Sequence, residues 1–432
     1  MGVVIGIVAD DITGANDIGT MFAKAGYVTH VYPFEAFDPS AAAAAAERPD
    51  VVILDTASRL DAPGIAYGKV ENATNRLKAA GARLWINKTC SVFRGNVGAE
   101  FDAMLDALGV SFAVVALGFP KNGRTTVDGM HYVRGLPLER SEFRNDPVHP
   151  MTTSSLVDIL RGQTKRRVER LGERTAGLTP EGLRARLEEA ESRGGYVILD
   201  VESQDDLRTI ALAVRDDYVL CGSSALSEEL ALTLPGTRGS AQAKPLPLVE
   251  GVGILCAAGS LMPQTAGQID YLKEKGVPIY EMDTLRLFSP QERAAELERL
   301  TDALVGVLRA GSHAAVHSTN DPVRVAETKR IGATLGMTGE QASRLVSDAL
   351  ADVASAVMAR TGQNRLVTAG GETSASICDK LGVSGMRVWK EIEPGVPSCI
   401  TLSEEPLMLV LKSGSFGKPS FLYDALQHLL EP

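Results

Sequence analysis

Short apolar runs rich in β-branched residues alternate with helical stretches, and this alternation constrains the fold more than any other feature. Six runs in the first half are predicted as strands: Val3–Ala9, Val51–Asp55, Leu84–Asn87, Ala113–Leu117, Tyr196–Val201 and Tyr218–Cys221. Segments between them have helical composition: Gly14–Ala25, Pro63–Ala80 and Gly98–Leu108. Strands that are apolar on successive residues are usually covered on both faces. The pattern therefore predicts an α/β fold with helices on both sides of a mostly parallel sheet.

A change of composition between residues 235 and 250 divides the chain. Pro235–Ser240 and Ala243–Pro247 are rich in Pro, Gly and small residues, which is typical of a linker. The alternation then resumes with further predicted strands: Val252–Ala257, Ala314–His317, Arg365–Ala369 and Leu407–Leu411. We therefore predict two α/β domains with mostly parallel sheets, at residues 1–236 and 250–432, and an active site in the interdomain cleft.

Charge and cysteine usage exclude several classes of protein. The net charge of −10 disfavours a nucleic-acid partner. No apolar run approaches the roughly 20 residues of a membrane span, and the N-terminus lacks the basic start of a signal peptide. Five scattered cysteines without a C-x-x-C pair disfavour disulfides and structural zinc. We expect a cytoplasmic protein with a small-molecule partner, and a surface helix at the alanine-rich tract Ala41–Ala46.

Two adjacent carboxylates, Asp10 and Asp11, follow the first predicted strand and precede a Thr-Gly turn. In open parallel sheets, ligands bind beyond the carboxyl ends of the strands. A carboxylate there can orient a substrate hydroxyl and accept its proton, or bind Mg²⁺. The alternative is that both side chains only cap the following helix. The residues alone leave both interpretations open.

The segment Asn87–Asn96 is a polar loop after another predicted strand, and it contains Lys88 and Arg94. These cations could hold a carboxylate, with Arg able to bind it through two nitrogens. An ordinary solvated loop is the alternative. Cys90 has no base next to it in the sequence, which disfavours a nucleophilic thiol.

Three glycine-containing loops follow predicted strands in the C-terminal half. They are Ala257–Ser260, Gly370–Ser374 and Lys412–Gly417. Glycines allow close backbone approach, and a helix N-terminus offers N–H donors to phosphate. Lys412 could stabilise the charge of a transferring phosphate, or it could be a surface lysine.

Familiar nucleotide motifs are absent. Gly417-Lys418-Pro419 is no Walker A motif, and Gly251-Val252-Gly253 is no dinucleotide fingerprint. The residues alone therefore indicate a two-domain α/β enzyme with an anion-binding second domain.

The loops together resemble the four-carbon acid sugar kinase family. The resemblance spans nearly the whole chain, in the family's order, through these segments: Ala9–Asp17, Phe119–Thr126, His131–Val133, Asp146–Pro150, Gly370–Ser374, Pro394–Pro397 and Lys412–Gly417. It implies that the N-terminal domain binds a sugar acid and that the C-terminal domain binds ATP with Mg²⁺. The implied substrate-binding residues are Asp11, Arg59, Lys88, Thr89, Cys90, Ser91 and Arg94. The implied nucleotide-binding residues are Ser260, Gly370, Gly371, Glu372, Thr373, Lys412, Ser413 and Gly414.

This resemblance predicts transfer of the ATP γ-phosphoryl group to the terminal hydroxyl of a four-carbon acid. Asp11 is the expected catalytic carboxylate, with Asp10 second. Many family members carry Asp-Ser-Thr where this chain has Thr89-Cys90-Ser91, and the form Lys88–Asn96 looks most like D-threonate kinases. Kinases of 3-oxo-tetronate or D-erythronate are close rivals.

A non-catalytic sugar-acid sensor remains a different class, and a dehydrogenase is a weaker third. The metal ligands and a homo-oligomeric state stay open.

Overall fold

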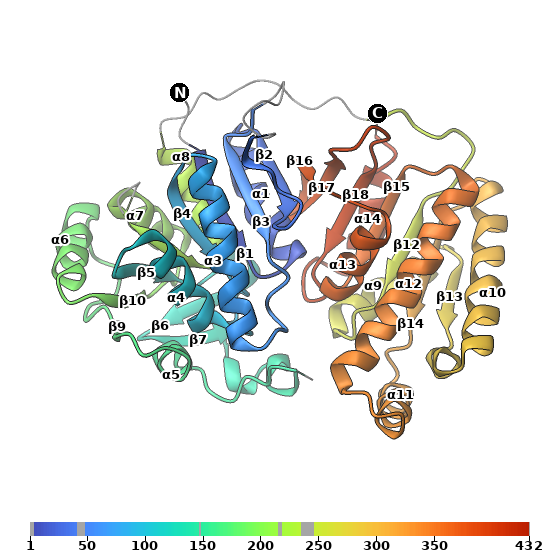
Figure 1. Ribbon diagram of the computed structural model, residues 1–432, viewed down its shortest axis with the longest axis horizontal. Helices are drawn as coiled ribbons and strands as arrows, with labels where there is room; N and C mark the ends of the chain where they lie inside the picture. The colour runs from blue at the N-terminus through green and yellow to red at the C-terminus, as the bar shows by residue number, and fades with distance from the viewer. Residues whose placement is uncertain (1–3, 41–47, 147, 215–217, 235–245, 432) are drawn as a thin grey trace. The chain divides into compact units, whose positions relative to one another are not determined.

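The computed structural model describes residues 4–40, 48–146, 148–214, 218–234 and 246–431 (Figure 1). The chain separates into two units, Met1–Ala241 and Gln242–Pro432. The boundary between the units falls in the segment where the sequence predicts a linker. The expected surface helix Ala41–Ala46 and the linker residues 235–245 lie outside the described residues.

The first unit contains a sheet in which all neighbouring strands run parallel. From edge to edge the order is β2 (Thr29–Pro33), β3 (Val51–Asp55), β1 (Val4–Ala9), β4 (Ala82–Lys88), β11 (Val219–Gly222), β5 (Phe112–Ala116), β10 (Gly195–Leu199) and β9 (Val168–Arg170). Every residue of β3, β5, β10 and β11 is buried, as the apolar runs predict. Strands β2 and β9 were not predicted from the sequence, because polar residues interrupt their apolar pattern.

Helices cover this sheet, and their starts follow local rules. They are α1 (Ile12–Lys24), α3 (Pro63–Ala79), α4 (Val97–Leu108), α5 (Leu156–Arg161), α6 (Pro180–Glu191), α7 (Gln204–Val214) and α8 (Ala225–Thr233). At α6, the Thr179 hydroxyl accepts a hydrogen bond from the Gly182 amide at 3.1 Å, and Pro180 is the first helical residue. Such a proline loses no hydrogen bond, because the first amides of a helix have no partner within it.

The path of the chain through the sheet reverses at β1. Strand β1 leads through α1 to β2 on one side, whereas β3 leads through α3 across β1 to β4 on the other. Because such crossovers are right-handed, α1 and α3 cover opposite faces. The loops after β1 and β4 therefore border the switch point of the sheet, where open α/β sheets bind their ligands.

A small antiparallel sheet is inserted after β5. It consists of β6 (Arg124–Val127), β7 (Met130–Val133) and β8 (Leu136–Pro137), flanked by the short helices η1 (Pro120–Asn122), η2 (Leu138–Arg140) and η3 (Glu142–Asn145). The Thr126 amide of β6 donates to the Val201 carbonyl oxygen at 2.8 Å, which anchors the insertion just beyond β10. The insertion thus extends from the same edge of the large sheet as the loop after β5.

The second unit has a mixed sheet. Its order is β13 (Ile279–Met282), β14 (Ala314–Ser318), β12 (Leu255–Ala258), β15 (Arg365–Ala369), β18 (Met408–Lys412), β17 (Val396–Thr401) and β16 (Met386–Glu393). The first five strands are parallel, and β17 is antiparallel to both of its neighbours, β18 and β16. Strands β13, β16 and β17 were not predicted from the sequence. The predicted class of two α/β domains with mostly parallel sheets is confirmed, whereas the active site in a cleft between them stays a prediction.

The second unit also has a switch point, and its strands are connected by a further set of helices. They are η4 (Thr284–Phe288), α9 (Pro263–Glu274), α10 (Pro290–Arg309), α11 (Pro322–Thr334), α12 (Gly339–Thr361), α13 (Gly371–Lys380) and α14 (Phe421–His428). Strand β12 leads through α9 to β13, whereas β14 leads through α11 and α12 across β12 to β15. The loops after β12 and β15 therefore lie at the position where this kind of sheet binds ligands.

Arg365, at the start of β15, is fully buried and ties the chain end to the sheet. Its guanidinium donates hydrogen bonds to the carbonyl oxygens of Leu246 and Leu429. Leu246 is the first described residue after the linker, and Leu429 follows α14. A buried guanidinium needs such acceptors, because an unpaired one would lose its hydration without compensation.

All five cysteines are buried, and none forms a disulfide with another described residue. Within the described part of the chain, no helix has both the length and the apolar character needed to cross a membrane.

Candidate active site

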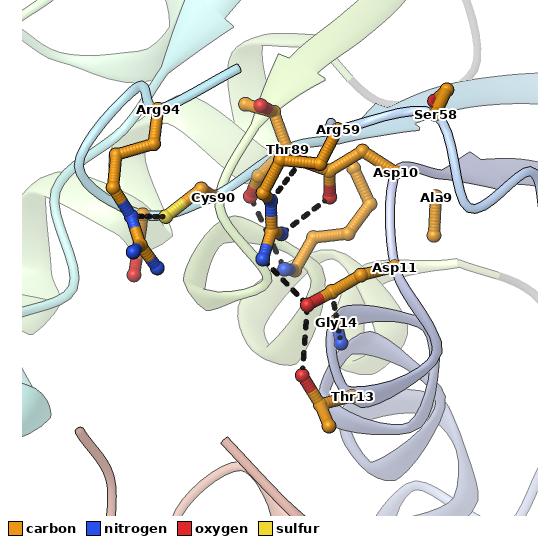
Figure 2. A network of polar contacts seen from close by, with 12 residues as sticks. Ala9, Asp10, Asp11, Thr13, Gly14, Ser58, Arg59, Thr89, Cys90 and Arg94 are labelled. Carbon is orange, nitrogen blue, oxygen red and sulfur yellow. Dashed lines mark hydrogen bonds and ion pairs between the residues drawn. The ribbon is translucent and has the colours of Figure 1, made fainter. Parts of the chain in front are cut away.

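An acidic pair clamped by one arginine lies at the switch point of the first sheet. Arg59 Nε and Nη2 donate to the two oxygens of Asp10, both at 2.7 Å. Arg59 Nη1 donates to Asp11 Oδ2 at 2.5 Å, so one guanidinium holds both carboxylates. Figure 2 shows the Arg59 side chain directed at this pair. The loop after β3 thereby crosses to the end of β1.

The two carboxylates have different environments. The side chain of Asp10 is 1% exposed, whereas that of Asp11 is 17% exposed. Asp11 also caps helix α1, because its Oδ1 accepts from the Gly14 amide at 2.7 Å, and its Oδ2 accepts from the Thr13 hydroxyl at 3.0 Å. Capping and a place in the site are therefore compatible for Asp11. Burial raises its pKa, but Arg59 and Lys88 more than compensate, so the pKa lies below its ordinary value.

Lys88, the last residue of β4, is buried beside the acidic pair. Its Nζ donates to the Thr89 carbonyl oxygen at 3.2 Å and lies 3.6 Å from Asp17 Oδ2. Asp17 is in turn held by the Ser224 hydroxyl at 2.7 Å. Burial raises the pKa of Asp17 to about 6, although Lys88 opposes the shift. An ammonium group has three donors, so Lys88 can make a further hydrogen bond.

The loop after β4 places Thr89, Cys90 and Arg94 along the same edge. Arg94 Nε donates to Cys90 Sγ at 3.4 Å (Figure 2). Arg94 Nη1 pairs with Asp146 Oδ2 at 2.5 Å. Burial raises the pKa of the Cys90 thiol, but Arg94 and Arg59 together bring it below the ordinary value. Thr89 is fully buried, and its hydroxyl oxygen has no hydrogen-bond partner among the residues that the structure describes.

Arg124 reaches this loop from the inserted sheet, and the sequence analysis did not assign it to the site. Its Nη1 donates to the Ser91 hydroxyl at 2.5 Å. The guanidinium groups of Arg94 and Arg124 lie 5.2 and 5.7 Å from the centroid of the Phe143 ring, within cation–π range. Arg124 and Asp146 belong to segments that carry the family resemblance, but no local pattern indicates that they meet Ser91 and Arg94.

A buried carboxyl group lies behind the acidic pair. Glu100 in α4 accepts a hydrogen bond from the Ser58 hydroxyl at 2.7 Å. The Ser58 oxygen lies 2.7 Å from the Thr56 hydroxyl, which donates to the Ala9 carbonyl oxygen at 2.9 Å. Burial, with the nearby Asp10 carboxylate, raises the pKa of Glu100 to about 8. A glutamate on the apolar face of the predicted helix 98–108 was the available signal for it.

In the second unit, the glycine loops after β12, β15 and β18 meet. The Gly370 amide donates to the Lys412 carbonyl oxygen at 2.8 Å, and the Gly259 amide donates to that of Ala369 at 2.9 Å. Gly370 has φ of 120°, a conformation open to glycine, and it precedes the first turn of α13. A β-carbon on Gly414 would lie only 2.1 Å from Ser260 Oγ, so the close approach of these two loops favours glycine.

The remaining residues of the predicted nucleotide set lie in the same loops. Gly371, Glu372 and Thr373 form the first turn of α13, where amide donors and the helix dipole favour an anion. Lys412 is fully buried, with its Nζ turned toward backbone carbonyl oxygens, and burial lowers its pKa to about 7. Direct contact between Lys412 and a phosphate stays a prediction. The carbonyl oxygens around Nζ favour a role in holding the loop that follows β18.

The structure thus gathers the predicted residues at two sheet edges. The first unit brings together Asp10, Asp11, Arg59, Lys88, Thr89, Cys90, Ser91 and Arg94. The second unit brings together Ser260, Gly370, Gly371, Glu372, Thr373, Ser413 and Gly414, with Lys412 beneath them. Among the described residues, no group of three or more His, Cys, Asp or Glu side chains is arranged to hold a metal ion.

Two family models match the chain. A sugar-binding N-terminal domain matches residues 5–230, and a nucleotide-binding C-terminal domain matches residues 255–422. A 3-oxo-tetronate kinase of Cupriavidus necator is 33% identical over 451 residues, covering 98% of this chain and 97% of the relative. The chain belongs to the four-carbon acid sugar kinase family.

Further relatives in the four-carbon acid sugar kinase family are the 3-oxo-tetronate kinases of Pseudomonas fluorescens (34% identical; 98% and 97% covered) and Methylobacterium radiotolerans (32%; 99% of each). A solved structure from Salmonella typhimurium LT2, provisionally described as a tRNA synthase, has a TM-score of 0.81 at 28% identity, covering 98% and 99% of the two chains. One from Haemophilus influenzae has a TM-score of 0.70 at 27% identity, covering 99% and 100%. The predicted family and its phosphotransferase class are confirmed.

Proposed function

We propose that the protein transfers the γ-phosphoryl group of ATP to the terminal (C4) hydroxyl of a four-carbon sugar acid. The observation that carries this proposal is the Asp10–Arg59–Asp11 clamp at the switch point of the first sheet, beside buried Lys88. A hydroxyl acid needs an acceptor for its reacting hydroxyl and a cation for its carboxylate. This edge of the first unit offers both.

Asp11 is the carboxylate that we assign to the substrate hydroxyl. It is the more exposed member of the pair, whereas both oxygens of Asp10 accept hydrogen bonds from Arg59. Phosphoryl transfer through a loose transition state depends mainly on positioning and charge stabilisation. A carboxylate with a lowered pKa suits that requirement, because it stays ionised and can orient the hydroxyl as a hydrogen-bond acceptor.

Lys88 is the residue that we assign to the substrate carboxylate. Arg94 is already paired with Asp146 at 2.5 Å, whereas the contact of Lys88 with Asp17 is longer, at 3.6 Å. The unpartnered hydroxyl of Thr89 lies next to Lys88 in the chain and could bond a further substrate oxygen. The proposed substrate site would then be bordered by Arg94, Cys90 and Ser91, which would not hold the acid directly.

ATP is proposed to bind at the glycine loops of the second unit, with its phosphates at the N-terminus of α13. Mg²⁺ would accompany the nucleotide, since it commonly keeps phosphate oxygens and water as ligands and needs few carboxylates from the protein. It would neutralise phosphate charge during transfer. We place the reaction in the cytoplasm, which supplies ATP and keeps thiols such as those of the five buried cysteines reduced.

The substrate is proposed to be 3-oxo-tetronate or one of the tetronates D-threonate and D-erythronate. The names of the relatives favour 3-oxo-tetronate, whereas the loop Lys88–Asn96 favours D-threonate. The test is ADP release measured with each acid and with buffer alone, followed by NMR of the product to locate the phosphate. Release stimulated by one acid, with phosphate on C4, is expected. Binding of an acid without any stimulated release would instead indicate a sensor.

Replacing Asp11 by Asn tests the assigned roles. The variant loses the charge that orients the hydroxyl, so we expect kcat to fall by about 10²–10⁴-fold, the usual contribution of such a group. Affinity for ADP should stay within about twofold, because Asp11 belongs to the other unit. A loss of ADP affinity with unchanged kcat would contradict the division of labour between the units.

A further inference from the structure

In the loop after β18, residues 413–418, the carbonyl oxygens of residues 413, 414, 416, 417 and 418 face buried side-chain donors. Lys412 Nζ donates to the carbonyl oxygens of Ser413 at 2.8 Å, Gly414 at 3.1 Å and Phe416 at 3.1 Å. It also donates to the Thr265 hydroxyl at 3.2 Å. An ammonium group has three N–H bonds, so these four acceptors use its whole donor capacity.

Helix α9 supplies the other donors to this loop. The Thr265 hydroxyl donates to the Gly414 carbonyl oxygen at 3.0 Å. The side-chain amide of Gln268 lies 3.0–3.1 Å from the carbonyl oxygens of residues 416, 417 and 418. Thr265 and Gln268 are both buried and are spaced so that they share one face of the helix. The whole loop is therefore held from one side.

The direction of the carbonyl groups fixes the direction of the amides. In a trans peptide, the C=O and the following N–H point in opposite directions. Inward carbonyl groups of Ser413 and Phe416 therefore turn the amides of Gly414 and Gly417 outward. In the described part of the chain, neither of these two amides donates a hydrogen bond to the protein. Outward amides of this kind form anion-binding concavities.

We propose that Lys412, Thr265 and Gln268 act as positioning residues that hold loop 413–418 with its Gly414 and Gly417 amides aimed at a nucleotide phosphate. This inference rests on the proposed ATP site of the second unit. Lys412 then acts through the loop and does not touch the phosphate. Gly414 closely approaches Ser260, which belongs to the loop after β12. The three positioning residues therefore also help to order the loop after β12.

Binding measurements on matched variants test this role. Lys412→Met and Gln268→Met keep the length of the side chain but remove its hydrogen-bond donors. The control is Lys273→Met, which replaces an exposed lysine on α9, the helix that carries Gln268. The dissociation constant of ADP is measured by calorimetry, together with KM for ATP, KM for the sugar acid and kcat. We expect Lys412→Met and Gln268→Met to bind ADP at least tenfold more weakly than the wild type and to show a raised KM for ATP. KM for the sugar acid and the behaviour of Lys273→Met should match the wild type.

Other outcomes separate the inference from the proposed function. If folded Lys412→Met kept its ADP affinity and lost only kcat, Lys412 would be a direct contact in the transition state and the inference would fail. If Lys412→Met did not fold, the test would rest on Gln268→Met. Wild-type ADP affinity in Gln268→Met would then overturn the proposed positioning role. If the wild type itself bound no ADP, the proposed nucleotide site would be wrong.

Discussion

Replacing Glu100 by Gln should change how the stability of the first unit depends on pH. Glu100 is buried in α4 and accepts a hydrogen bond from Ser58 at 2.7 Å. Burial is the main cause that raises its pKa from 4.5 to about 8, and the carboxylates of Asp10 and Asp11 add to it. Arg59 and the Ser58 hydrogen bond oppose the shift without cancelling it. Gln keeps the shape and the acceptor oxygen but cannot ionise.

The sign and size follow from proton linkage. Between the unfolded and folded pKa values of Glu100, the folded state holds a proton that the unfolded state has lost. The free energy of unfolding therefore falls as the pH rises, by about 1.4 kcal/mol per pH unit. From pH 5 to pH 8 this amounts to roughly 4 kcal/mol in the wild type, an upper figure for one group. In Glu100→Gln this part of the pH dependence should vanish.

Urea unfolding at pH 5, 6, 7 and 8 measures the effect. Trp85 lies in β4 of the first unit, so a Trp389→Phe background makes fluorescence report on that unit. The control is Glu191→Gln, an exposed glutamate at the end of α6. Asp17 and Asp55 also have raised pKa values, about 6 and about 7, but they are common to both proteins and cancel in the difference. Parallel pH profiles for the wild type and Glu100→Gln would refute the reasoning.

Two further changes probe the edge of the first sheet. Arg59→Ala leaves the carboxylate of Asp10 buried without its partner, so unfolding by urea should show a loss of about 3–5 kcal/mol; the same loss in the double variant with Asp10→Asn would argue against that cause. Iodoacetamide should modify Cys90 first, because Arg94 and Arg59 lower its pKa while burial raises the pKa of Cys256 to about 12. Peptide mass spectrometry measures the rates, and equal modification of both thiols would contradict the expectation.

Local pattern was enough to predict the ends of the strands that lead into the candidate site, β1 and β4 in the first unit and β12, β15 and β18 in the second. Because parallel strands present their carboxyl ends at one edge, the placement of Asp10, Asp11 and Lys88 at a common edge followed from the sequence. The glycine loops at residues 370 and 414 were predicted from the sequence for the same reason. These predictions depend on periodicity and on short-range turn chemistry, which a sequence displays directly. The polar strand β2 escaped them because its burial depends on neighbours far along the chain.

Only the tertiary structure decided what the polar side chains contact. Arg59 reaches across from the loop after β3 to both carboxylates, and Arg124 arrives from an inserted sheet, through pairings between segments far apart in sequence. Lys412 follows a strand, as the sequence analysis expected, yet its Nζ points inward to carbonyl oxygens. The physical reason is that strand and loop positions follow from local backbone preferences. The direction and the partners of a charged side chain depend on which distant groups packing brings within hydrogen-bond range.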